Sequence, residues 1–148
     1  MPVFKSKARI FFHSDDVSYT LKHKTLIRDW IAKIIYSEKG GMGEINFIFC
    51  SDKYLHKINL TYLKHDTYTD IVSFDYSDKK LLSGDIFISI DRVKENAKKF
   101  NAAFTEELHR VMIHGILHLL GYKDKTRSQK ATMQGKEDFC LSLLSLNK

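Results

Sequence analysis

The histidines His114 and His118 lie four residues apart in an apolar stretch of the chain. On an α-helix this spacing places two side chains on one face, so both imidazoles can reach a single metal ion. The pair alone is ambiguous, because two hydrogen-bonded histidines in a protein core can share the same spacing. The residues that follow must therefore decide between a metal site and a structural role.

Gly121 and Asp124 extend the pattern to His-x3-His-x2-Gly-x2-Asp. Glycine readily adopts the left-handed conformation that ends a helix and turns the chain back. The carboxylate of Asp124 can then meet both imidazoles and leave a fourth position open, which is the layout of catalytic zinc. The sequence thus predicts one zinc ion per chain, held by His114, His118 and Asp124. It indicates no catalytic side chain, so a zinc-bound water is the expected nucleophile.

The same spacing occurs in the long zinc-peptidase motif H-E-x-x-H-x-x-G-x-x-H. Here Gly115 replaces the general-base glutamate of that motif, and Asp124 replaces its third histidine. A peptidase of this type needs a carboxylate beside the metal, and glycine cannot supply one. A metzincin-like metallopeptidase is therefore a disfavoured alternative.

The segment HGILHLLGYKD instead resembles the signature H-G-x-L-H-L-x-G-Y-D-H of the YbeY endoribonucleases. Lys123 replaces the usual Asp of that signature, and Asp124 replaces its last His. The stretch NLTYLKHDTYTDIVSFDY is similar to the family pattern N-x-x-Y-R-x-x-D-x-x-T-D-V-L-S-F, and SGDIFIS is similar to a G-D-I strand. The resemblance covers about residues 45–140. Seven fixed positions of the signature agree: His114, Gly115, Leu117, His118, Leu119, Gly121 and Tyr122.

This resemblance implies a single-strand-specific, zinc-dependent endoribonuclease of ribosomal RNA maturation. The expected activity is processing of the 3′ end of the small-subunit RNA, with a further role in ribosome quality control. The implied partners are precursor ribosomal RNA and, beyond it, the ribosome or ribosomal proteins. A third hypothesis, which Leu63 and the charged ligand Asp124 motivate, is a ribosome-associated binding protein with a structural zinc.

Two departures from the family pattern bear on this expectation. Asp124 adds a negative charge to the metal centre, so it should lower the pKa of a bound water less than a neutral histidine would. Leu63 stands where the family usually has an arginine suited to binding phosphate. Lys64 offers a point charge next to it, and we take Lys64, Lys123 and Lys125 as candidate RNA contacts.

The composition is compatible with a phosphate-rich partner in a reducing compartment. The 148 residues carry a formal net charge of +6, which favours anionic ligands. Cys50 and Cys140 are far apart in apolar surroundings, as expected of buried free thiols. No apolar run reaches membrane-spanning length and no signal peptide is recognisable, so we expect a cytoplasmic protein.

The elements that must position these residues alternate between strand and helix patterns. Strands are expected at 8–13, 45–50, 70–76 and 84–90, the last two as a hairpin, and helices at 21–40, after Ser51, after Asp91, after Thr105 and at 128–146. Ser51, Asp91 and Thr105 are the expected N-caps. We predict an α+β fold: one four-stranded mixed sheet packed with four to five helices, forming a single metal-dependent hydrolase domain over residues 1–148. The helix that carries His114 and His118 is apolar almost all round and should be central.

Other polar residues receive structural interpretations. Asp70 and Asp85 match family positions and are expected at strand starts, bonded to local backbone. His109 lies five residues before His114, which turns it away from the metal face. Tyrosines near lysines could stack on RNA bases, although core packing is the commoner role.

Overall fold

The structure is a computed structural model that describes residues 9–38, 40–65, 67–78 and 81–144. These residues form one mixed sheet and five helices, which confirms the predicted α+β class. The strands are β1 (Arg9–Ser14), β2 (Gly41–Cys50), β3 (Ile71–Asp75) and β4 (Leu81–Ser89). The helices are α2 (Lys24–Ser37), α3 (Asp52–Leu63), α4 (Ile90–Lys99), α5 (Phe104–Leu119) and α6 (Arg127–Ser142).

The four strands lie in the order β1-β2-β4-β3. β1 pairs with β2 in parallel, and β2 pairs with β4 in parallel, with Phe47 opposite Ile86. β3 runs antiparallel to β4, with Ser73 opposite Ile86. The predicted hairpin is therefore confirmed, and it forms the edge of the sheet nearest the candidate metal site.

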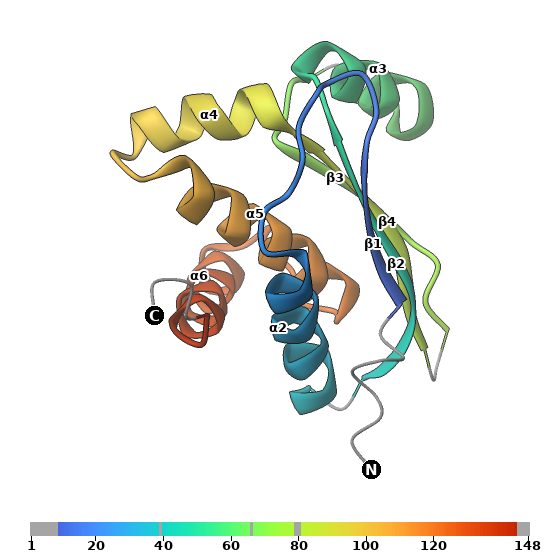
Figure 1. The fold of residues 1–148 in the computed structure, drawn as a ribbon, viewed down its shortest axis with the longest axis vertical. Helices are drawn as coiled ribbons and strands as arrows, with labels where there is room; N and C mark the ends of the chain where they lie inside the picture. Colours follow the sequence, from blue (N-terminus) through green and yellow to red (C-terminus); the bar gives the residue numbers. More distant parts are fainter. Residues whose placement is uncertain (1–8, 39, 66, 79–80, 145–148) are drawn as a thin grey trace.

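The two faces of the sheet bury different helices. Alternate residues of each strand point to opposite faces, so that Phe47, Phe49, Ile86 and Ile88 join the main core with α2 and α5. Val72 and its neighbours on the other face form a smaller cluster with Leu55 of α3. Figure 1 shows α5 between the sheet and α6, with α3 near one end of the sheet.

Helix α5 is the most deeply buried helix of this arrangement, as its apolar sequence predicts. Its buried apolar residues are Leu108, Val111, Met112, Ile113, Ile116, Leu117 and Leu119. At Gly115 the helix backbone approaches the sheet closely, because an added Cβ would lie 3.0 Å from Ile71 Cδ1 and 3.0 Å from Ile86 Cγ2. Because glycine has no side chain, it is the residue that allows this helix–sheet spacing.

Helix α2 is joined to the last helix through its single tryptophan. The Trp30 indole Nε1 donates a hydrogen bond of 2.8 Å to the carbonyl of Cys140 on α6. Trp30 also packs edge-on against His109 of α5, with ring centroids 6.2 Å apart. One side chain therefore contacts both helices that build the site.

The predicted helix caps are partly corrected. Ser51 caps α3 as expected, accepting a bond from Tyr54 N. Asp91 is wrong as the cap of α4: the cap is Ser89, whose Oγ accepts from Arg92 N, while the Asp91 carboxylate accepts from Asp52 N at the start of α3. Ser89 occupies the end of β4, so the helix follows its strand without a loop.

Thr105 is also wrong as a cap, because α5 begins at Phe104 and its N-cap Ala103 makes no side-chain bond. The last helix begins one residue earlier than expected, after a capping box between Thr126 and Gln129. The helix ends at Ser142, with Leu143 as its C-cap, so the expected end near residue 146 is wrong. Leu143 N bonds to the Cys140 carbonyl and closes the last turn.

The remaining structural expectations concern the cysteines and the membrane. Cys50 and Cys140 are free and buried, as predicted. Among the helices that the structure describes, none has the length and apolar character needed to cross a membrane.

Candidate metal centre

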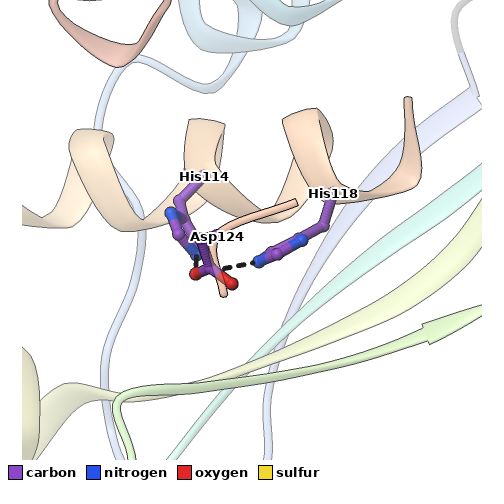
Figure 2. A group of neighbouring side chains, drawn as sticks. All are labelled: His114, His118 and Asp124. Carbon is purple, nitrogen blue, oxygen red and sulfur yellow. Dashed lines mark ion pairs between the residues drawn. The ribbon is translucent and has the colours of Figure 1, made fainter. Parts of the chain in front are cut away.

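The three predicted ligands meet at the end of α5. Figure 2 shows His114 and His118 on the same side of the helix, with Asp124 between their rings. Asp124 Oδ2 lies 3.3 Å from His114 Nε2 and 3.4 Å from His118 Nε2. One potential ligand atom from each residue lies within 4.8 Å of the other two. Among the described residues, these three side chains are the group of His, Cys, Asp or Glu residues close enough together to hold a metal ion. The local spacing therefore predicts their convergence correctly.

Gly121 turns the chain so that Asp124 returns to the helix. Its φ of +107° is in the region that favours glycine, as predicted. The turn is fixed by backbone bonds from Gly121 N to His118 O and from Tyr122 N to Leu117 O, both 3.0 Å long. These bonds satisfy the last carbonyls of α5 and set the direction of the loop.

Hydrogen bonds at the opposite ring nitrogens orient both histidines. His114 Nδ1 lies 2.6 Å from Glu137 Oε2, and His118 Nδ1 lies 3.0 Å from the Tyr122 carbonyl. A carboxylate and a carbonyl only accept hydrogen bonds, so each neutral imidazole carries its proton on Nδ1. Both Nε2 lone pairs are then free to bind a metal on the side of Asp124.

Glu137 is a residue of the candidate site that the sequence did not reveal. Only 7% of it is exposed, and its second oxygen accepts a bond of 2.8 Å from Arg110 Nη1. Arg110 also donates from Nη2 to Asp138 at 2.6 Å. The available signal was a glutamate among the buried positions of α6, between Met133 and Cys140 at helical spacing.

The carboxylates around His114 determine its charge. Burial alone lowers the pKa of His114, but the hydrogen bond to Glu137 and the nearby charges of Glu137, Asp124 and Asp70 raise the pKa above its ordinary value. Burial raises the pKa of Asp70, and the charge of His114 opposes that shift. The site thus favours a cation close to His114.

Asp70 and Asp85 have different environments. Asp70 precedes β3, as expected, and its carbonyl accepts from Ser89 N while its carboxylate lies 3.5 Å from Asn96 Nδ2. Asp85 is wrong as a strand start, because β4 begins at Leu81. Its carboxylate accepts a bond from Asn46 Nδ2 on the neighbouring strand.

The position of Gly115 bears on the peptidase alternative. A side chain there would point at Ile71 and Ile86 in the core. A glutamate at this position would enter the helix–sheet interface and could not reach the metal ligands. The packing, as well as the residue type, therefore opposes peptidase chemistry of the metzincin kind.

A cleft of about 680 Å³ opens beside the candidate ligands. It extends from the metal site along α5 and α6 to the turn between α4 and α5. His114 and Asp124 line one end of it, and Phe100 and Asn101 line the other. Four acidic side chains contribute to its walls, namely Glu106, Glu107, Asp124 and Glu137.

The candidate RNA contacts lie on two elements. Lys123 and Lys125 are exposed and flank Asp124 in the loop between α5 and α6. Lys64 is exposed at the C-cap of α3, with a left-handed φ of 58°. Leu63, at the end of that helix, is 39% exposed.

His109 has the structural role predicted from its rotation on the helix. It is 7% exposed and packs on Trp30. Burial, reinforced by the charge of His23, lowers its pKa to about 4. His109 is therefore neutral in the folded protein at neutral pH.

Two imidazoles and one carboxylate, converging from a helix and the loop that follows it, form a candidate metal site of the kind that metal-dependent hydrolases use. Comparison with known families narrows this class. Residues 9–145 match the model of a family described as Endoribonuclease YbeY. The chain belongs to the YbeY endoribonuclease family, and the match extends beyond the expected residues 45–140.

Individual relatives agree with this assignment. The chain is 53% identical over 123 residues to the Endoribonuclease YbeY of Flavobacterium johnsoniae, covering 83% of this chain and 88% of that protein. It is 51% identical over 142 residues to the Endoribonuclease YbeY of Christiangramia forsetii, covering 96% and 99%. The solution structure of TM1509 from Thermotoga maritima has a similar fold, with a TM-score of 0.65 and 27% identity, over 91% of this chain and 88% of the other.

Proposed function

We propose that this chain is a zinc-dependent endoribonuclease that cleaves single-stranded RNA. Membership of the YbeY family makes it a metal-dependent endoribonuclease of ribosomal RNA maturation. The finer proposal is that it processes the 3′ end of the small-subunit RNA and acts in ribosome quality control, in the cytoplasm, as one hydrolase domain over residues 1–148. The observation that carries the metal chemistry is the convergence of His114 Nε2, His118 Nε2 and Asp124 Oδ2.

The donor set fits zinc. Zinc binds imidazole nitrogen and carboxylate oxygen and, in catalytic sites, takes three protein ligands. Both histidines have their Nδ1 atoms engaged by acceptors, which leaves Nε2 as the donor atom in each ring. We propose His114, His118 and Asp124 as the ligands of one zinc ion.

We propose separate roles for the zinc ion and for the residues that hold its ligands. Bound zinc supplies a Lewis acid that polarises a phosphate oxygen and lowers the pKa of water. Glu137 fixes the ring of His114, and the Tyr122 carbonyl fixes the ring of His118. We assign no side chain as general base.

Substrate binding is proposed to rest on surface lysines. Lys123 and Lys125 flank the ligand Asp124, so they can hold phosphates next to the metal. Lys64 is the third candidate, in place of an arginine at position 63. The net charge of +6 supports an RNA partner, and the ribosome or its proteins are the proposed wider context.

The test compares substrates with and without a chelator. Purified protein is offered precursor ribosomal RNA, a single-stranded oligonucleotide, the same sequence as a duplex, and a peptide library. Chelator-sensitive cleavage of the RNA and of the single strand is expected, and the duplex and peptides should remain intact. His118→Ala should abolish cleavage, whereas His13→Ala, which removes an exposed histidine of β1, should not.

Other outcomes would identify the alternatives. Peptide cleavage would establish a metallopeptidase. Zinc binding without cleavage of any substrate would establish a binding protein with a structural zinc.

A further inference from the structure

Glu107 is a buried carboxylate that the metal site does not use. It is 8% exposed, and no described residue donates a hydrogen bond to its carboxylate. Its oxygens keep some contact with solvent, because no fully enclosed side-chain oxygen among the described residues lacks a partner. It nevertheless lines the cleft that holds His114 and Asp124. For a carboxylate, losing most of its contact with water without gaining a protein donor is costly. A ligand that supplies donors in the cleft would remove this cost.

The distance of Glu107 from the metal site restricts its role. It lies seven residues before His114, which places both side chains on one face of α5 with a rise of about 10 Å between them. A proton-transfer group must be within hydrogen-bond reach of the reacting atoms. Glu107 is too far away for that, and it lies where a part of the substrate next to the scissile phosphate can reach.

The charge at this end of the cleft disfavours a phosphate. Glu106 and Glu107 contribute two adjacent acidic groups here, and Glu137 contributes a third where it contacts His114. Two cations also line the cleft: Arg110, whose guanidinium Glu137 and Asp138 already engage, and the exposed Lys130 of α6. Directly beside Glu106 and Glu107, a neutral part of the substrate therefore fits better than a phosphate.

The other lining residues suit a nucleobase. Phe100, at the C-cap of α4, is 61% exposed and offers an aromatic ring for stacking. Asn101, with a left-handed φ of 56°, and Gln134 of α6 add amide groups that can donate and accept. An aromatic ring, two amides and a buried acceptor are the groups by which proteins bind unstacked bases.

We infer that this end of the cleft binds a guanine base of the RNA substrate, with the Glu107 carboxylate accepting hydrogen bonds from N1–H and the N2 amino group. An ionised carboxylate has two acceptors and no donor. Among the four RNA bases, guanine alone presents two adjacent donors on its Watson–Crick edge. Adenine and cytosine each present an acceptor beside the donor, and uracil presents one donor between two acceptors.

This inference rests on the proposed function, because it takes RNA to be the substrate. It goes further in giving the enzyme a base preference next to the cleavage site. Burial raises the pKa of Glu107, and the negative charge of Asp70 adds to the shift while Arg110 opposes it. Guanine donors would stabilise the ionised form.

Mononucleotide binding tests the inference without requiring cleavage. Calorimetric titration of the zinc-loaded protein with GMP, AMP, CMP, UMP and IMP keeps the phosphate constant and changes only the base. GMP should bind about ten-fold more tightly than the other four, because a matched bidentate pair discriminates by this order. IMP lacks only the N2 amino group, so it isolates the second hydrogen bond.

The variants are matched in charge. Glu107→Gln replaces one acceptor by a donor and should abolish the preference for GMP. Glu95→Gln makes the same charge change on an exposed residue of α4 that does not line the cleft, and should keep it. Equal affinity of the parent protein for GMP and IMP would overturn the inference, even if Glu107→Gln did not fold, and so would a preference that persists in folded Glu107→Gln.

Cleavage mapping separates this inference from the proposed function. Single-stranded oligonucleotides that differ only in the position of one guanine should be cut at a fixed offset from it. Cleavage that ignores the guanine refutes the base pocket and leaves the endoribonuclease intact. Absence of any metal-dependent RNA cleavage refutes the proposed function on which the inference rests.

Discussion

Glu137 Oε2 on α6 lies 2.6 Å from His114 Nδ1 on α5, so a proposed ligand histidine is held by a residue of another helix. The carboxylate fixes the tautomer and the ring orientation, and Arg110 in turn fixes the carboxylate. Metal affinity therefore depends on how α6 packs against α5.

Glu137→Gln should weaken zinc binding by about 10–100-fold, the usual effect of removing such a partner. The amide cannot accept from His114 as strongly as the carboxylate and leaves Arg110 without its buried counter-ion. Competition with a chromogenic chelator measures the affinity. Asp138→Asn, at the exposed partner of Arg110, is the control and should change it little. Equal affinities of Glu137→Gln and the parent would refute the positioning role.

Asp124→Ala should lose most of the bound zinc, whereas Asp124→His should retain it, because imidazole is also a good zinc ligand. The histidine also raises the net charge of the centre by one. The limb of a pH–activity profile that reports ionisation of the metal-bound water should therefore move to lower pH. Elemental analysis and the profile check the two parts separately. Parental zinc content in Asp124→Ala would mean that the third ligand lies elsewhere.

Gly115→Ala should destabilise the fold by about 1–3 kcal/mol, as expected of overpacking. Its Cβ would press on Ile71 and Ile86, and Ile86 is fully buried on an inner strand. Urea unfolding measures the change. The matched control is Gly135→Ala on α6, where a Cβ would meet nothing within 4 Å. That substitution should stabilise by about 0.5–1 kcal/mol through helix propensity, and a stabilised Gly115→Ala would contradict the close approach.

His109 should make the folded state sensitive to acid. Its folded pKa of about 4 lies below the ordinary value of 6.5, so the unfolded chain binds the proton more tightly. The contribution of neutral His109 is therefore complete above pH 6.5 and is lost as the pH falls towards 4, by up to ~3 kcal/mol. His109→Leu should flatten the dependence of the unfolding free energy on pH in this window. An unchanged slope would show that His109 ionises freely in the folded protein.

RNA binding should survive removal of the metal and weaken steeply with salt, because lysine–phosphate contacts release counterions. Replacing both Lys123 and Lys125 by alanine should reduce the logarithmic salt slope by roughly 1.4 for a single-stranded ligand, at about 0.7 for each contact. Fluorescence anisotropy at several salt concentrations gives the slope. Replacement of Lys22 and Lys24, at the start of α2, provides a charge-matched control. A slope that falls equally in both double variants would place the RNA elsewhere.

The local sequence was sufficient to predict the three proposed ligands, but not the residues that surround them in the structure. His114, His118, Gly121 and Asp124 lie within eleven positions, so helix geometry and one glycine turn determine where they meet. Glu137 reaches His114 only because α6 packs against α5, and no spacing within either helix reveals that contact. Glu107 gave no signal in the sequence, because its burial comes from tertiary packing.

The helix N-caps show the same difference between what the local sequence predicts and what tertiary packing decides. Ser51 follows a strand and precedes its helix, so its role was visible in the sequence. Asp91 is an equally good cap by residue type, but Ser89 takes the position because β4 runs directly into α4. The carboxylate of Asp91 then bonds to Asp52 N, a partner that is distant in sequence.

The bond from Trp30 to the Cys140 carbonyl gives the molecule an intrinsic optical reporter. Trp30 is the single tryptophan of the chain, and Cys140 lies one helical turn beyond Glu137. Fluorescence excited at the indole therefore comes from one residue, at the junction of α2, α5 and α6. Because α6 also carries the carboxylate that holds His114, the emission spectrum records the seating of this helix without an added label.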